Sequence, residues 1–242
     1  MVKYEKLIKS MSIITIVGSG LFLILTIIAM IIYPGGTKFN HYETRYIFLR
    51  NYFSDLGRTT TFLGESNLPT MILFATSLTI VGIALISYFS VIPLVFKENK
   101  KAFVLSLISS INGFVCAVFY IGIGYLPYDL YLTIHTNFVY IAFTGSLLTI
   151  FLGMLAIFLQ KDYPNFYAWF YLLFLLILIG YLIILYAGPS SSTDFGLSVQ
   201  VVGQKVIVYT EVISFAIQSI GTINYVRKSK NTLTTNINHT NI

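Results

Sequence analysis

Four polar side chains follow one face of the last apolar segment of the chain. The four are Gln200, Gln204, Glu211 and Gln218. A helix turns by about 100° per residue, which places these side chains within about 40° of one another around its axis. Polar groups inside a bilayer normally face other helices or a cavity rather than lipid. We therefore expect the stripe to point into the protein, with Gln200 and Gln204 as interhelical hydrogen-bonding groups.

Glu211 lies near the middle of that segment, where a carboxyl has two interpretations. In the functional one it carries a proton or binds a cation. In the structural one it is protonated and hydrogen-bonds a neighbouring helix, for which the third apolar segment offers these partners: Asn112, Ser109 and Ser110. Lys205 lies about 140° around the helix from Gln200, so we expect its stem to extend toward the lipid headgroups.

A carboxylate and an imidazole flank the start of the fourth apolar segment. Asp129 and His135 are separated by about 9 Å of helical rise, and a bend in the chain would let Asp129 orient His135. His135 would then act as a general base on water or a lipid hydroxyl, whereas the structural alternative is a satisfied buried histidine. A metal site requires three or four ligands, and no nucleotide-binding glycine pattern occurs. No metal and no cofactor are predicted.

The long first loop, residues 34–67, carries the remaining candidate groups. Arg45 and Arg50 are placed to contact anionic headgroups. In the segment 51–57, Asn-Tyr-Phe-Ser-Asp-Leu-Gly, Ser54 or Asp55 can bond backbone amides and Gly57 can adopt a positive φ. Aromatic and leucine side chains recur at helical spacing at Tyr42, Tyr46, Leu49 and Phe53. That spacing predicts an interfacial helix on the headgroup layer, and a compact cap on the helix ends is the alternative.

These groups must be positioned by a membrane bundle. The 242 residues are 56% apolar and 10% charged, against about 25% charged in a soluble domain, which excludes an ordinary cytosolic protein. Because about 20 apolar residues cross a bilayer, we predict an all-α, polytopic integral membrane bundle of six transmembrane helices in a single domain, 1–230. The predicted spans are 11–33, 68–96, 102–126, 130–159, 166–187 and 197–226.

Lysine and arginine distribution predicts the orientation of the bundle. Ten of these residues flank the spans on the side of the termini and four lie in the first loop, so both termini are expected in the cytoplasm and the protein in the plasma membrane. The tail 231–242 is polar and aperiodic and is predicted to be a disordered cytoplasmic segment. The bases form no continuous face, which excludes nucleic-acid binding. The single cysteine, Cys116, excludes an intrachain disulfide.

Three short motifs in this order resemble a known family. They are the segment 51–57, Leu126-Pro127-x-Asp129-x5-His135-Thr136, and Gln204-Lys205. Over about residues 13–225 the chain resembles the prokaryotic six-helix membrane proteins described as domain of unknown function 998, and more remotely the DRAM and Sfk-like membrane proteins. The resemblance implies one extracytoplasmic cluster of these residues: Ser54, Asp55, Gly57, Asp129 and His135. The remoter relatives suggest lipid homeostasis by analogy.

The leading functional prediction is binding of a lipid headgroup or small amphiphile in an outer-leaflet polar pocket. The ligand-binding candidates are Arg45, Arg50, Asp55, Asp129, His135, Gln204 and Lys205. The alternatives are an intramembrane lipid hydrolase or transferase that uses His135 and Asp129, a proton-linked transporter that uses Glu211, and a structural or partner-binding protein. Membrane lipids are the predicted partners, and helix-mediated oligomerisation is left open.

Overall fold

The computed structural model describes residues 4–240, with side chains through Ser229. This part of the chain is all-α, with six long helices and one short 3-10 helix, η2, in the first loop. The bounds are α1 (Glu5–Ile32), η2 (Phe53–Gly57), α2 (Leu68–Val95), α3 (Lys100–Gly124), α4 (Tyr128–Leu159), α5 (Phe166–Ala187) and α6 (Asp194–Thr240).

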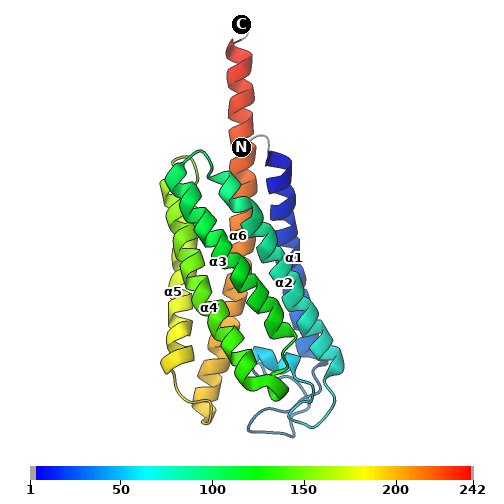
Figure 1. The fold of residues 1–242 in the computed structure, drawn as a ribbon. Helices are drawn as coiled ribbons and strands as arrows, with labels where there is room; N and C mark the ends of the chain where they lie inside the picture. The colour runs from blue at the N-terminus through cyan, green and yellow to red at the C-terminus, as the bar shows by residue number, and fades with distance from the viewer. Residues whose placement is uncertain (1–3, 241–242) are drawn as a thin grey trace.

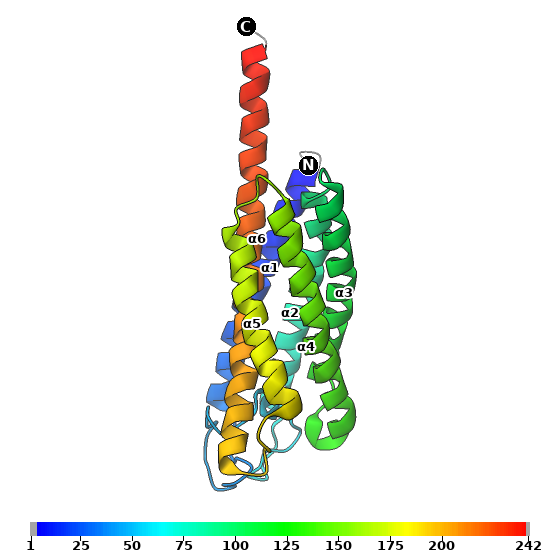
Figure 2. The same cartoon turned by 90° about the vertical axis from the view of Figure 1, so that its left-hand side faces the viewer.

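The six long helices form a closed ring around a shared interior. Each helix packs on the next one in the chain, α6 packs on α1 to close the ring, and α2 also touches α6 across the interior. The two termini lie at one end of the bundle and the first loop lies at the other, as Figures 1 and 2 show. All six helices are long and apolar enough to cross a membrane. The predicted all-α fold with six candidate spans is confirmed, and the bundle has the form of a multi-pass membrane protein.

Helix ends differ from the predicted spans by a few residues where polar groups extend a helix. Helix α1 begins at Glu5 instead of residue 11, with an ion pair between Glu5 and Lys9 one turn apart. Helix α6 begins at Asp194 instead of residue 197, and the Thr193 hydroxyl caps it by accepting a hydrogen bond from the Gly196 amide at 3.1 Å. A prediction from hydropathy alone leaves out these first helical turns, because their residues are charged or polar.

Helix α6 continues beyond the bundle. Its candidate membrane span ends at Ser229, and its backbone remains helical to Thr240, so that the last turns project past the other helices (Figure 1). The tail 231–242 lies here, partly outside the described residues. Its disorder stays a prediction.

The first loop folds as a compact cap, and the predicted interfacial helix is wrong. The side chain of Asn51 donates to the carbonyl of Gly36 at 2.9 Å and accepts from the amide of Ile47 at 2.9 Å. Such side-chain bonds to the backbone compete with helix formation. The four residues expected on one helical face also separate, because Tyr42 is 89% exposed whereas Phe53 is 3% exposed.

Glycines permit the close approaches within this cap. Gly36 has a φ of +85°, and a Cβ there would lie 2.2 Å from the amide nitrogen of Leu63. Gly57 does not adopt the predicted positive φ. It lies in η2, where a Cβ would meet the ring of Phe74 at 2.5 Å. The requirement at Gly57 is therefore for space and not for an unusual backbone conformation.

Aromatic rings fill the interior on the side of the termini. The ring centroid of Phe215 lies 5.3 Å from that of Tyr88, 5.4 Å from Phe89, 6.2 Å from Tyr171 and 6.4 Å from Phe174. These five residues, which we call the aromatic plug, come from α2, α5 and α6 and are all nearly inaccessible to solvent. Edge-to-face packing of this kind leaves little free volume.

Candidate functional site

Two neighbouring residues of α6 hold the cap onto the bundle. The side-chain oxygen of Gln204 accepts a hydrogen bond from the Phe53 amide at 2.8 Å, and the Lys205 ammonium donates to the carbonyl of Asn51. Lys205 is only 1% exposed, and its ammonium lies near the rings of Tyr46 and Phe48. The expected extension of Lys205 toward lipid headgroups is wrong, because the folded first loop covers it and supplies the carbonyl and ring contacts that replace water.

Asp129 holds the cap from the side of α4. Its carboxylate accepts from the Thr59 hydroxyl at 2.6 Å and amide at 3.1 Å, and from the Thr60 amide at 3.3 Å. The predicted pairing of Asp129 with His135 is therefore not formed. His135 instead contacts the carbonyl of Leu126. Asp129 therefore binds the first loop, and His135 binds the segment before α4.

Asp55 is the centre of a buried polar network beneath the cap. One carboxylate oxygen accepts from the Tyr128 hydroxyl at 2.6 Å, and the other accepts from the Asn51 amide group at 3.0 Å and the Tyr52 backbone amide at 2.8 Å. Arg58 donates to the same Tyr128 hydroxyl at 2.8 Å. Burial raises the pKa of Asp55, and the hydrogen bonds from Tyr128 and Asn51 oppose this only in part.

Asp55→Asn is expected to remove one source of pH-dependent stability. Because the folded-state pKa lies above the ordinary value of 3.8, the folded protein binds a proton at Asp55 more tightly than the unfolded chain does. This stabilisation is fully present below about pH 3.8 and is lost as the pH rises through the folded-state pKa. The difference in Tm between wild type and variant, measured in detergent, should fall over that window. A difference that grows as the pH rises would contradict the assignment.

His135 presents one ring nitrogen to a pocket. Its Nδ1 lies 2.6 Å from the carbonyl oxygen of Leu126. Because a carbonyl can only accept, Nδ1 carries the hydrogen and Nε2 is left as an acceptor in the neutral ring. His135 is 5% exposed, so this acceptor nitrogen faces a pocket rather than bulk solvent.

That pocket has a volume of about 310 Å³ and lies under the cap between α4, α5 and α6. We call it the loop-end pocket. Its hydrogen-bonding side chains come from the first loop, from α4, α5 and α6, and from the connection between α5 and α6: Tyr52, Ser54, Tyr128, His135, Thr136, Tyr140, Tyr181, Ser191, Gln200 and Gln204. Gln200 also donates to the carbonyl of Ile184 at 2.9 Å, which fixes the α5 side of the opening.

The two arginines predicted to bind anionic groups do not line the loop-end pocket. Arg50 forms an ion pair with Asp194 at 2.8 Å and so joins the first loop to the start of α6. Arg45 is exposed on the surface of the cap. Among the lining residues of the described chain, none is an aspartate, glutamate, lysine or arginine. The structure therefore separates Arg45 and Arg50 from His135 and Gln204.

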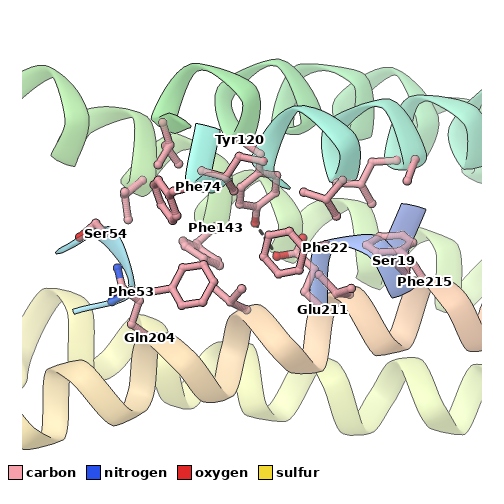
Figure 3. Close-up of a pocket in the computed structure, with 18 of the residues that line it drawn as sticks. Ser19, Phe22, Phe53, Ser54, Phe74, Tyr120, Phe143, Gln204, Glu211 and Phe215 are labelled. Carbon is pink, nitrogen blue, oxygen red and sulfur yellow. Dashed lines mark hydrogen bonds between the residues drawn. The ribbon is translucent and has the colours of Figure 1, made fainter. Parts of the chain in front are cut away.

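A smaller central cavity of about 50 Å³ extends from the loop-end pocket into the bundle. Ser54, His135, Val139 and Gln204 line both spaces, and we call the three polar residues among them, Ser54, His135 and Gln204, the neck. Glu211 lies deeper in the central cavity, where its two carboxyl oxygens accept from the Tyr120 hydroxyl at 2.7 Å and the Ser146 hydroxyl at 3.2 Å. Figure 3 shows Tyr120 reaching Glu211 from the opposite wall, with Ser54 and Gln204 toward one end.

The partners expected for Glu211 are wrong. Asn112 instead donates to the Gly145 carbonyl and the Thr149 hydroxyl, both at 2.7 Å, and Ser109 donates to the Thr149 carbonyl. These bonds join α3 to α4. Gln218 has a similar role, since it donates to the Tyr167 carbonyl of α5 at 2.8 Å.

Tyr120, Ser146, Arg58 and Tyr128 are site residues that sequence reasoning missed. Serine and tyrosine are frequent in apolar helices of this chain, so nothing in the local pattern distinguishes Tyr120 or Ser146 from other core residues. Tyr128 is adjacent to Asp129, and its role could have been suspected from that position. Within residues 4–240, no group of three His, Cys, Asp or Glu side chains is placed to hold a metal ion.

The residues implied by the family resemblance lie at one end of the bundle. Asp55 and Asp129 hold the cap, Ser54 and His135 form part of the neck, and Gly57 lies in η2. Comparisons with family models, curated proteins and solved structures found no match. The family assignment stays a prediction.

Proposed function

We propose that this chain is a plasma-membrane protein that binds a small amphiphile, with an uncharged hydrogen-bonding headgroup, in the loop-end pocket. In this proposal the first loop faces outward and both termini face the cytoplasm, as the lysine and arginine distribution predicts. The observation that carries the proposal is a pocket of about 310 Å³ lined by neutral donors and acceptors from separate segments. Pockets with a few convergent polar groups are typical ligand sites.

The charges near the pocket favour an uncharged headgroup. Asp55, Arg58 and Asp129 lie beside it, but each is engaged by hydrogen bonds within the cap or between the cap and α4. A charged headgroup would lose its hydration without gaining an opposite charge, which is costly in a partly buried site. A hydroxyl or amide can instead donate to His135 Nε2 and exchange hydrogen bonds with Gln204 or Ser54.

A matched pair of variants tests this proposal at His135. In His135→Asn, the side-chain amide can still donate to the Leu126 carbonyl in place of Nδ1, while the acceptor at Nε2 is absent. In His135→Gln, the longer side chain restores a polar group near the Nε2 position. Native mass spectrometry of gently solubilised protein should show bound amphiphile in wild type, about tenfold weaker retention in His135→Asn, as for one lost hydrogen bond of about 1.4 kcal/mol, and partial recovery in His135→Gln.

Two outcomes would overturn the proposal. Wild-type protein without any bound amphiphile would favour a structural or partner-binding role, and equal retention in all three proteins would place the ligand elsewhere. The same preparations also address the enzymatic alternative. Turnover of labelled lipids that disappears in His135→Asn would identify a hydrolase or transferase in which His135 acts without orientation by Asp129.

A further inference from the structure

The central cavity contains buried polar groups that lack protein partners. Ser19 of α1 and Ser54 of the first loop line it and are 3% and 8% exposed. Neither hydroxyl hydrogen-bonds another described residue, and neither oxygen is among the side-chain atoms that the described protein encloses completely, so both face the cavity. Buried polar groups are nearly always hydrogen-bonded, to protein or to ordered water. These two hydroxyls therefore indicate water inside the cavity.

The size of the central cavity agrees with this occupant. A water molecule requires about 10 to 15 Å³ of such space together with polar partners, and the cavity offers about 50 Å³. Hydroxyls and amide groups lie at the neck, and the Glu211 carboxyl and Ser19 lie deeper, as Figure 3 shows. A few water molecules would connect Glu211 with the loop-end pocket.

The opposite end of the central cavity is closed. Phe215 follows Glu211 by one helical turn and lines the cavity, and the other rings of the aromatic plug surround it. The only hydroxyls among these five rings, those of Tyr88 and Tyr171, hydrogen-bond to each other at 3.0 Å, and the phenylalanine rings offer water no polar partner. Glu211 therefore has a polar route toward the first loop and a barrier of packed aromatic rings toward the termini.

We propose that Glu211 is a proton-binding carboxyl that exchanges protons with the first-loop side only, through water in the central cavity. In the exchange step the carboxylic acid transfers its proton to a cavity water, which gives a carboxylate and a hydronium ion. The hydroxyls of Tyr120 and Ser146 already donate toward the two carboxyl oxygens and stabilise the carboxylate. The other titratable groups that face this space are Cys116 of α3, near Glu211, and His135 of α4, at the neck. This inference goes beyond amphiphile binding and does not depend on it.

Infrared spectroscopy tests proton binding directly. Wild-type protein should show the carbonyl stretch of a protonated buried carboxyl at some pH at which the protein is folded, and Glu211→Gln should lack that band. If cavity water reaches Glu211, the wild-type band should shift when the solvent is changed to D2O. A missing band, a band that persists in Glu211→Gln, or a band that does not shift in D2O would overturn the proposal. Amphiphile binding is measured separately, by the native mass spectrometry described above, so the two proposals can fail independently.

Proton flux into vesicles tests the one-sided access. Liposomes that contain wild-type protein and an internal pH-sensitive dye should be tight to protons. Phe215→Ala opens the aromatic plug and should raise the leak at least tenfold, and Phe215→Ala combined with Glu211→Gln should return it to the wild-type level. Phe96→Ala, which removes a buried ring outside the plug, is the control for a loosened core and should leave the vesicles tight. A leak that is unchanged by Glu211→Gln would overturn the assigned route.

Discussion

Asp55→Ala is expected to lower the free energy of unfolding by about 3 to 5 kcal/mol, the range for removing one member of a buried polar network. The carboxylate accepts hydrogen bonds from the Tyr128 hydroxyl, the Asn51 amide group and the Tyr52 backbone amide. Alanine removes the acceptor of all three, and the Arg58 guanidinium keeps only Asp129 of the two carboxylates that act on it. Equilibrium unfolding in mixed micelles measures the loss, and hydrogen exchange should show it first in the amides of residues 47–60.

Asp194→Ala is the matched control for this change. Asp194 forms an ion pair with Arg50 of the first loop, but its side chain is 63% exposed. Exposed ion pairs contribute about 0 to 1 kcal/mol. Comparable losses in the two variants would show that the Asp55 network does not stabilise the cap.

Gly36→Ala is expected to have the second large effect, a loss of about 3 kcal/mol or more in the free energy of unfolding. The methyl group would lie 2.2 Å from the Leu63 amide nitrogen and 2.6 Å from the Phe62 carbonyl carbon. Both contacts are to backbone, so no side-chain rotation relieves them. The residue also has a φ of +85°, which alanine adopts at an additional cost. The same unfolding measurement in mixed micelles applies.

Gly64→Ala separates the two causes. Gly64 has a φ of +93°, but a Cβ there meets no atom within 4 Å. We expect this variant to lose only the conformational cost of about 1 to 2 kcal/mol. If Gly36→Ala is no worse than Gly64→Ala, the close approach of residues 36 and 62–63 does not contribute to the stability of the cap.

The helices were predictable because their signal is local. Each apolar segment is long enough by itself to cross a bilayer, so hydropathy identified all six, and α5 agrees with the predicted span at both ends. The residues of the polar stripe on α6 likewise contact protein groups: Gln200, Gln204, Glu211 and Gln218. Helical periodicity identifies such a face without knowledge of its neighbours.

The contacts within the site were not predictable because they join distant parts of the chain. Thr59 and Asp129 are 70 residues apart, and Asn51 and Lys205 are 154 apart. Which groups meet depends on the rotation of each helix and on the path of the first loop, and neither is encoded by local spacing. The expected pairing of Asp129 with His135 failed for this reason, since the loop supplied a closer set of donors to Asp129.

The long-range anchors of the cap also have a consequence for the order of folding. The first loop emerges early in synthesis, whereas Gln204 and Lys205 belong to α6, the sixth of the long helices along the chain. Contacts of such high sequence separation form late, after their partners are available. The loop-end pocket is therefore completed only after α6 has been synthesised, and a nascent chain that stops before α6 has helices but no loop-end pocket.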